Sequence, residues 1–199
     1  MNTIYTIGHS QHTLEHFLQM LKKNNINYVI DVRSTPYSKF AQDYDREHIK
    51  KYLEDNEIHY AFMGKHFGAR QEKQGLYTSE GYLDFSKVEE AQFFQDAIQN
   101  VMKGMEANRI ALMCTEKKPI DCHRAILVGN AFFNRGCNVE HILPDGSIQT
   151  HEELNEELLD MYFPTRNQLH LFEVHTEEGD LKEAYKMRNK DIGYNISER

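Results

Sequence analysis

The sequence lacks tryptophan, has only four prolines and three cysteines in 199 residues, and contains no apolar run of bilayer-spanning length. An odd number of cysteines, in a chain that begins with a strand-like segment rather than a signal peptide, argues against the disulfide framework of small secreted domains. We therefore expect a cytoplasmic protein with reduced thiols and no membrane partner. At this length a core can form without disulfides or structural metal.

Basic blocks are also absent, and the formal net charge is −8. This balance disfavours binding of bare nucleic acid through the whole surface. It leaves open a local basic pocket for a small anionic or nucleotide-like ligand, so nucleic acid stays a compatible but less favoured partner. A homodimer is equally compatible with the composition.

Short apolar runs alternate with longer segments of helical spacing. The pattern predicts strands over 3–7, 28–32, 58–63, 109–113 and 139–143, and helices over 13–24, 44–56, 86–105 and 122–135. Gly136 stands where a left-handed residue would end the last of these helices. Strands that alternate with helices favour parallel pairing with right-handed crossovers. We therefore predict an α/β fold, a Rossmann-like three-layer sandwich with a mostly parallel sheet.

Beyond residue 150 the chain becomes acidic and amphipathic, and Leu154, Leu158 and Met161 are expected to pack onto the sheet. An apolar patch over 169–174 and a charged helix over 180–190 follow. We expect one domain over 1–162 and an extension over 163–199 that docks on the domain or on a partner. Histidines with polar neighbours are expected at the surface: His48, His59, His151, His170 and His175.

Chemically active residue types follow the predicted strands directly. These segments are Gly8-His9-Ser10, Arg33-Ser34 and Cys114-Thr115-Glu116, and Cys122-His123-Arg124 opens the next predicted helix. Carboxyl ends of parallel strands lie along one edge of a sheet, where open α/β folds bind ligands. The sequence therefore predicts one crevice built from segments far apart in the chain.

Arginines in these segments predict an anion-binding crevice, because a guanidinium grips phosphate or carboxylate in a bidentate manner. The candidate anion-binding residues are Arg33, Arg124, Ser10, Ser34, Ser38 and His123, with Lys39, Lys65, Arg70, Lys117 and Lys118 in nearby loops. Backbone N–H groups near Asp121, at the start of a helix, would add donors. The alternative is that Arg33 pairs with Asp31 or Glu116 and only holds loops together.

Cys122 is the candidate nucleophile, since a helix N-terminus and neighbouring cations lower the pKa of a thiol. Adjacent helical residues point about 100° apart, so His123 need not face this thiol. The long separation of Cys114 from Arg124, with Pro119 between them, differs from the compact loop of thiol phosphatases and rhodaneses. A thiolate mechanism here would not use that loop.

Glu116 is the candidate proton carrier, and His9 is the alternative. Cys114 is either a second reactive thiol or a small core residue, and Cys137 is expected only to pack. A zinc site of Cys114, Cys122 and His123 with His9 or His141 is chemically allowed, but no CxxC pair supports it. We therefore expect neither a metal nor a cofactor.

With these residues in view, the chain resembles the bacterial and archaeal family named domain of unknown function 488. The matching pieces are Thr6-Ile-Gly-His-Ser10, Asp31-Val-Arg-Ser34 with Pro36, Ser38 and Phe40, the Tyr60 to Gly68 segment, Cys114-x-Glu116, Cys122-His-Arg124 and His141-Ile142. The resemblance implies a single α/β domain with a Rossmann-like sheet and brings no established reaction. One departure is Lys65-His66-Phe67-Gly68, where a Leu-Gly-Gly type of loop is more usual.

Two functional hypotheses follow. The first is an enzyme, a hydrolase or transferase, that acts on a phosphorylated or nucleotide-like anion or on a nucleic-acid end. The second is a non-catalytic domain that binds an anion or a partner protein.

Overall fold

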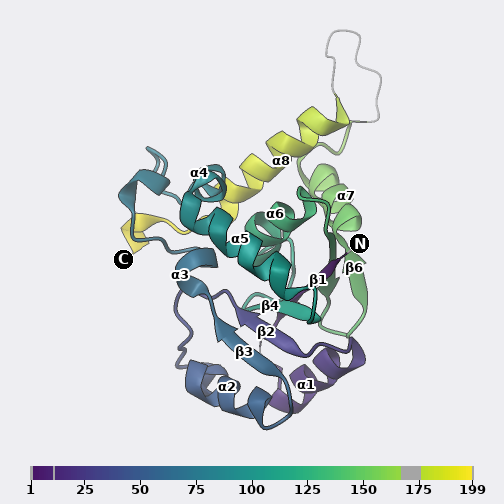
Figure 1. The fold of residues 1–199 in the computed structure, drawn as a ribbon. Helices are drawn as coiled ribbons and strands as arrows, with labels where there is room; N and C mark the ends of the chain where they lie inside the picture. Colours follow the sequence, from purple (N-terminus) through teal and green to yellow (C-terminus); the bar gives the residue numbers. More distant parts are fainter. Residues whose placement is uncertain (1, 11, 167–175, 199) are drawn as a thin grey trace.

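A six-stranded sheet forms the centre of the computed structural model, which describes residues 2–10, 12–166 and 176–198 (Figure 1). The strands are β1 (Thr3–Gly8), β2 (Tyr28–Asp31), β3 (His59–Phe62), β4 (Ile110–Cys114), β5 (Asn138–Ile142) and β6 (Ile148–Thr150). Their order is β3-β2-β4-β1-β5-β6, and only the last pair is antiparallel. The predicted α/β class with a mostly parallel sheet is confirmed.

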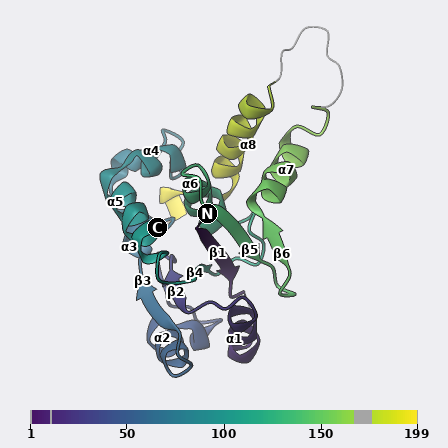
Figure 2. The same cartoon turned by 45° about the vertical axis from the view of Figure 1, so that its right-hand side comes forward.

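Alternating side chains of the strands build a core on each face of the sheet. Tyr5 and Ile7 pack on the face covered by α1 (Leu14–Lys23) and α2 (Arg46–Glu54), whereas Ile4 and Leu112 belong to the opposite core. The second face is covered by α3 (Gly64–Phe67), α4 (Phe85–Glu90), α5 (Gln92–Gly104) and α6 (Asn130–Phe133). Figures 1 and 2 show these three layers, so the predicted sandwich is confirmed.

Two predicted helices differ from the structure. The helix expected over 86–105 is interrupted at Ala91, which is extended, and the Gln95 amide binds the carbonyl of Glu89 freed by the break. The helix expected over 122–135 begins with a π-helical segment, η3 (Arg124–Gly129). A side chain on Gly129 would come within 3.2 Å of the Arg124 carbonyl oxygen, so glycine accommodates this wide turn. Single-turn π-segments often occur at functional sites.

The C-terminal helices are α7 (His151–Tyr162) and α8 (Glu177–Ile192), which lie side by side and project from the sheet (Figure 2). Thr150 and Glu153 form a capping box at the start of α7. Leu154 and Leu158 are buried as predicted, but Met161 is 46% exposed because the end of α7 extends beyond the sheet. The predicted apolar patch over 169–174 lies outside the described residues, as do His170 and His175.

The end of α8 returns to the main body of the protein. The Asn189 amide donates to the Leu83 carbonyl at 2.8 Å, and its oxygen accepts from the Phe85 N–H at 2.8 Å. Arg188 binds the Ile120 carbonyl and pairs with Asp121. These bonds fix the chain that follows α8 against the sheet edge where β4 ends. Among the described residues, no helix combines the length and apolarity that a membrane span requires.

A buried hydrogen-bond chain joins the sheet to α8. The Tyr185 hydroxyl donates to Asn155 at 2.7 Å and lies 3.0 Å from His151, which lies 3.1 Å from His141, which lies 2.8 Å from the Thr6 hydroxyl. Because the Tyr185 hydroxyl donates to Asn155, its oxygen accepts a hydrogen from His151; His151 in turn accepts from His141, and His141 accepts from Thr6. Each imidazole then donates through one nitrogen and accepts through the other, which requires both to be neutral. The prediction that His151 is a surface residue is therefore wrong, because this side chain is fully buried.

This chain predicts a loss of stability in acid. Burial lowers the pKa of His151 from 6.5 to about 3, and the pKa of His141 is lowered in the same direction by burial and by His151. Below about pH 6.5 these histidines bind protons in the unfolded chain but not in the folded chain, so the free energy of unfolding decreases as the pH is lowered. For His151 alone we expect a loss of about 2 kcal/mol near pH 5.

Urea unfolding near pH 7.5 and near pH 5 measures this difference. The variant His151→Gln should show a smaller pH dependence, whereas His48→Gln, at an exposed position, should keep that of the wild type. The assignment of neutral buried imidazoles would be contradicted if His151→Gln kept the full acid sensitivity.

Candidate functional site

The carboxyl ends of the central strands open into a hollow of about 430 Å³. It is lined by Arg33, Ser34, Thr35, Ala69, Arg70, Cys114, Thr115, Glu116, Asp121, Cys122, His123, Asp191, Ile192, Gly193 and Tyr194. We call this hollow the thiol pocket. It brings together the segments after β2 and β4 and the residues before η3, as the strand-end pattern predicts, without the segment after β1, and it adds the end of α8 and the chain that follows.

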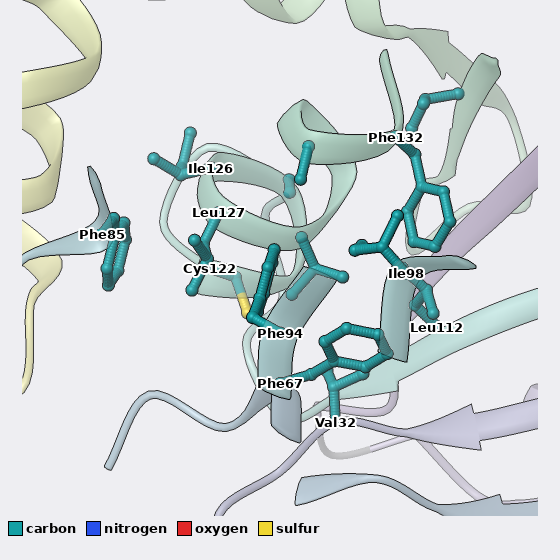
Figure 3. Close-up of a cluster of buried hydrophobic side chains, with 14 of the residues drawn as sticks. Val32, Phe67, Phe85, Phe94, Ile98, Leu112, Cys122, Ile126, Leu127 and Phe132 are labelled. Atoms are coloured by element: carbon teal, nitrogen blue, oxygen red, sulfur yellow. The ribbon is translucent and has the colours of Figure 1, made fainter. Parts of the chain in front are cut away.

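Two thiols and an imidazole meet in the thiol pocket. Cys114 ends β4 on the face that η3 covers, and Cys122 belongs to the same apolar cluster (Figure 3). The sulfur atoms of Cys114 and Cys122 each lie 3.9 Å from Nδ1 of His123. Nε2 of His123 lies 3.2 Å from the Val32 carbonyl oxygen, which accepts its hydrogen. The His123 imidazole therefore faces both thiols, although only Cys122 is next to it in the sequence.

The surroundings of Cys122 favour a thiolate. Burial alone would raise the pKa of this thiol, but a hydrogen bond from Cys114, the Arg124 guanidinium and the His123 imidazole together hold it well below its usual value. The bond to Cys122 and burial raise the pKa of Cys114, so Cys114 keeps its proton and donates it. Burial would lower the pKa of His123, but the bond to Cys122, the negative charge there and the bond to the Val32 carbonyl together raise it. These shifts favour a thiolate on Cys122 and a neutral thiol on Cys114, and they favour protonation of His123.

Glu116 is the carboxylic residue of the thiol pocket whose pKa is raised. Burial and the negative charge of Cys122 raise the pKa of its carboxyl, against the lowering effect of Arg124 and His123. A carboxyl with a raised pKa keeps its proton to higher pH and can donate it to a substrate. Cys122 and Glu116 thus lie in one hollow with opposite shifts, a pattern typical of a nucleophile and an acid.

Arg124 organises the loop that carries Glu116. Its side chain is fully buried, and Nη1 donates to the Glu116 carbonyl at 2.7 Å while Nη2 donates to the Lys117 carbonyl at 3.4 Å. In this arrangement Arg124 does not line the thiol pocket. In the structure the guanidinium binds the 114–117 loop and lowers the pKa of Cys122; that it also binds an anion stays a prediction.

Gly8 lets this loop approach the end of β1. A Cβ at this position would lie 2.0 Å from the Glu116 carbonyl oxygen and 3.2 Å from Nη2 of Arg124. We expect Gly8→Ala to displace the loop and to lower the free energy of unfolding by about 1–3 kcal/mol. Urea unfolding measures the change.

Gly75→Ala provides the matched control, because nothing lies within 4 Å of a Cβ there and its φ is not positive. We expect it to change stability by less than about 0.5 kcal/mol. Equal effects of the two substitutions would contradict the close approach of the loop to β1.

Arg33 forms a buried ion pair with Asp31 at the end of β2. Nε and Nη2 donate to the two carboxylate oxygens at 2.9 Å and 2.7 Å, and Nη2 also donates to the Tyr44 carbonyl. The Tyr60 hydroxyl donates to Asp31 at 2.7 Å. The alternative contact considered for Arg33 is therefore present, and the side chain still lines the thiol pocket while being only 5% exposed.

Three predicted site residues lie outside the thiol pocket. His9 is buried, stacks on Tyr44 with ring centroids 4.1 Å apart, and contacts Nη1 of Arg33 at 3.3 Å. Burial and Arg33 lower its pKa to about 4. Ser10 adopts a positive φ of 45° and lines a different hollow. The Ser38 hydroxyl accepts from the Phe40 N–H.

The structure adds residues that strand-end reasoning misses. Tyr60 donates to Asp31 and so supports the pair of Asp31 and Arg33, and only the resemblance marks the region of Tyr60. Asp191 and Tyr194 reach the thiol pocket from the far end of the chain. No pattern in the sequence indicates that the chain around Asp191 and Tyr194 lies near Cys122. Its position depends on the bonds of Arg188 to the Ile120 carbonyl and of Asn189 to the Leu83 carbonyl.

Cys114, Cys122 and His123 are also a set of donors for a soft metal. One ligand atom from each lies within 4.8 Å of the others, and the Val32 carbonyl would orient the imidazole as in many zinc sites. His141, the further ligand considered from the sequence, belongs instead to the chain of His151 and Thr6. Within the described residues the cluster offers three protein ligands.

A comparison with family models matches residues 13–130 to the domain of unknown function DUF488. The chain belongs to the DUF488 family. No curated protein and no solved structure matches the chain. The matched part contains Arg33, Cys114, Glu116 and Cys122, whereas the 191–194 wall of the thiol pocket lies beyond it. Membership of the DUF488 family establishes no reaction, so function must be argued from the site.

Proposed function

We propose that this DUF488 protein is an enzyme that hydrolyses or transfers the phosphoryl group of a phosphorylated or nucleotide-like anion in the thiol pocket. The observation that carries the proposal is the position of Cys122 beside Cys114 and His123, with its pKa lowered, in a hollow also lined by Glu116 and Arg33. A nucleophile, an acid and a fixed cation in one hollow are the parts that phosphoryl transfer through a covalent intermediate requires.

In the first step the Cys122 thiolate attacks phosphorus. A sulfur–phosphorus bond forms as the bond from phosphorus to the leaving oxygen breaks, and that oxygen takes the proton of Glu116. Water then attacks phosphorus and gives a proton to the Glu116 carboxylate, and the thiolate leaves as phosphate is released. His123 and Arg33 balance the negative charge that develops on the phosphoryl oxygens.

Anion recognition in this scheme falls to the cations that line the thiol pocket. Arg33 is held rigidly by Asp31, so it presents its charge without losing side-chain freedom on binding. Arg70 is exposed, and its backbone N–H donates to the Ser34 hydroxyl at 2.8 Å. Ser34 thereby connects the loop after β2 with the loop after α3.

Turnover of phosphorylated compounds tests the proposal. Wild-type protein should release phosphate from a nucleoside monophosphate and from p-nitrophenyl phosphate, and Cys122→Ser should abolish both reactions. Glu116→Gln should slow the nucleotide reaction by about 10²-fold or more and the nitrophenyl reaction far less, because nitrophenolate leaves without a proton. Full activity of Cys122→Ser would contradict the proposal.

Two other results would also overturn it. Stoichiometric zinc in protein purified without chelators would assign Cys122 as a metal ligand instead of a nucleophile. Anion binding without turnover of a broad panel of phosphate esters would favour the non-catalytic alternative, a domain that only recognises an anion.

A further inference from the structure

A second hollow of about 420 Å³ adjoins the thiol pocket. The two share Ser34 and Arg70 as lining residues, so they lie next to each other, and we refer to the two hollows together as the groove. The second hollow, which we call the basic subsite, lies between the end of β3, the 64–73 loop and the start of α5. Its lining includes Phe62, Lys65, His66, Arg70, Lys73 and Phe93.

The basic subsite is positive although the protein is acidic. Lys65, Arg70 and Lys73 line it, and Glu72 is the acidic residue in its lining. Within the part of the chain that the structure describes, no carboxylate forms an ion pair with any of these three cations. No internal carboxylate of the described residues therefore shares their charge, and it adds to that of Arg33, which is held in place by Asp31.

Aromatic rings accompany these cations. The Lys73 amino group lies 5.3 Å from the centre of the Phe93 ring, and the Arg70 guanidinium lies 4.5 Å from that of Tyr194. Phe62 and Phe93 are partly buried, so each exposes part of a ring to the hollow. Cations alternating with aromatic rings along a groove are typical of surfaces that bind single-stranded nucleic acid, because phosphates contact the cations and bases stack on the rings.

We propose that the substrate is the phosphorylated end of a single-stranded nucleic acid, with its terminal phosphate in the thiol pocket and the adjoining nucleotide in the basic subsite. This inference rests on the proposed function and names its substrate class. Arg70 lies at the boundary of the two hollows, with its guanidinium over the Tyr194 ring. In this arrangement it stands between the terminal phosphate and the phosphate that joins the first nucleotide to the next. The net charge of −8 limits contact to this groove.

Fluorescence anisotropy with a 5′-phosphorylated oligothymidylate tests the inference, with thymidine monophosphate and ATP as competitors. The oligonucleotide should bind at least about tenfold more tightly than either competitor. In Lys65→Ala/Lys73→Ala the salt dependence of log K should become shallower by about 0.7, because the contact with the phosphate of the adjoining nucleotide is lost. Phe93→Ala should weaken binding of the oligonucleotide by about fivefold or more.

Lys22→Ala/Lys103→Ala is the matched control. These lysines stand in the last turns of α1 and α5, at the opposite edge of the sheet, and their loss should leave oligonucleotide affinity unchanged. Phosphatase activity of Lys65→Ala/Lys73→Ala on p-nitrophenyl phosphate should equal that of the wild type.

The outcomes separate this inference from the proposed function. Equal affinities for the oligonucleotide and thymidine monophosphate would contradict nucleotide binding in the basic subsite, but they would not contradict the reaction proposed for the thiol pocket. Tighter binding of ATP than of the oligonucleotide would assign the groove to a polyphosphate instead of a strand. If p-nitrophenyl phosphate is not hydrolysed, the proposed function itself fails.

Discussion

Replacement of Asp31 by Ala is expected to lower the free energy of unfolding by about 3–5 kcal/mol. Asp31 is fully buried at the end of β2 and accepts from the Arg33 backbone, the Arg33 guanidinium and the Tyr60 hydroxyl. Its loss leaves the Arg33 charge inside the protein without a counterion. Urea unfolding of the purified variant gives the value.

A double-mutant cycle isolates the pair. Asp31→Ala/Arg33→Ala should be clearly less destabilised than the sum of the two single variants, because neither charge is then left unpaired. Lys51→Ala, which breaks an exposed pair with Asp55, should cost less than about 1 kcal/mol. Additive effects of Asp31→Ala and Arg33→Ala would contradict the buried pair that positions Arg33 in the thiol pocket.

The second large effect concerns the ionisation of Cys122. Near neutral pH the folded protein should show the ultraviolet absorbance of one thiolate, and Cys122→Ser should remove it completely. The reason is the lowered pKa that Cys114, Arg124 and His123 impose on this thiol. His123→Gln should raise the pKa of Cys122, because it removes the partner that carries the compensating charge.

Cys137→Ser is the control for this titration. Burial raises the pKa of Cys137, so this residue contributes no thiolate near neutral pH, and its replacement should leave the absorbance unchanged. A thiolate signal that survives in Cys122→Ser, or is absent from the wild type, would contradict the assignment of Cys122 as the ionised thiol.

Much of the sheet could be predicted from the sequence because its strands are short, buried and separated by helical patterns. Each of the β1, β2, β4 and β5 strands lies within a residue or so of its predicted range. The break at Ala91 and the π-helical start at Arg124 could not be predicted, because Gln95 also binds Arg135, 40 residues away, and Gly129 lies close to Val139 and His141 of β5.

The meeting of Arg33, Cys114, Glu116 and Cys122 followed from topology alone, since parallel strands place their carboxyl ends together. The different contacts of the two arginines could not be predicted from the topology. The sequence places two guanidinium groups near one edge and leaves open whether Arg33 pairs with Asp31, whereas the structure shows this pair and shows that Arg124 binds loop carbonyls. The contribution of Tyr194 requires the docking of α8, which leaves no local signal.

The central claim is that an anion binds beside a reactive thiolate, and the alkylation rate of Cys122 by iodoacetamide with and without tungstate tests it most directly. Peptide mass spectrometry follows each cysteine separately near neutral pH. The account predicts that Cys122 is alkylated faster than Cys137, and that tungstate at tenfold its dissociation constant slows this reaction about tenfold. An alkylation rate of Cys122 that tungstate leaves unchanged would contradict it.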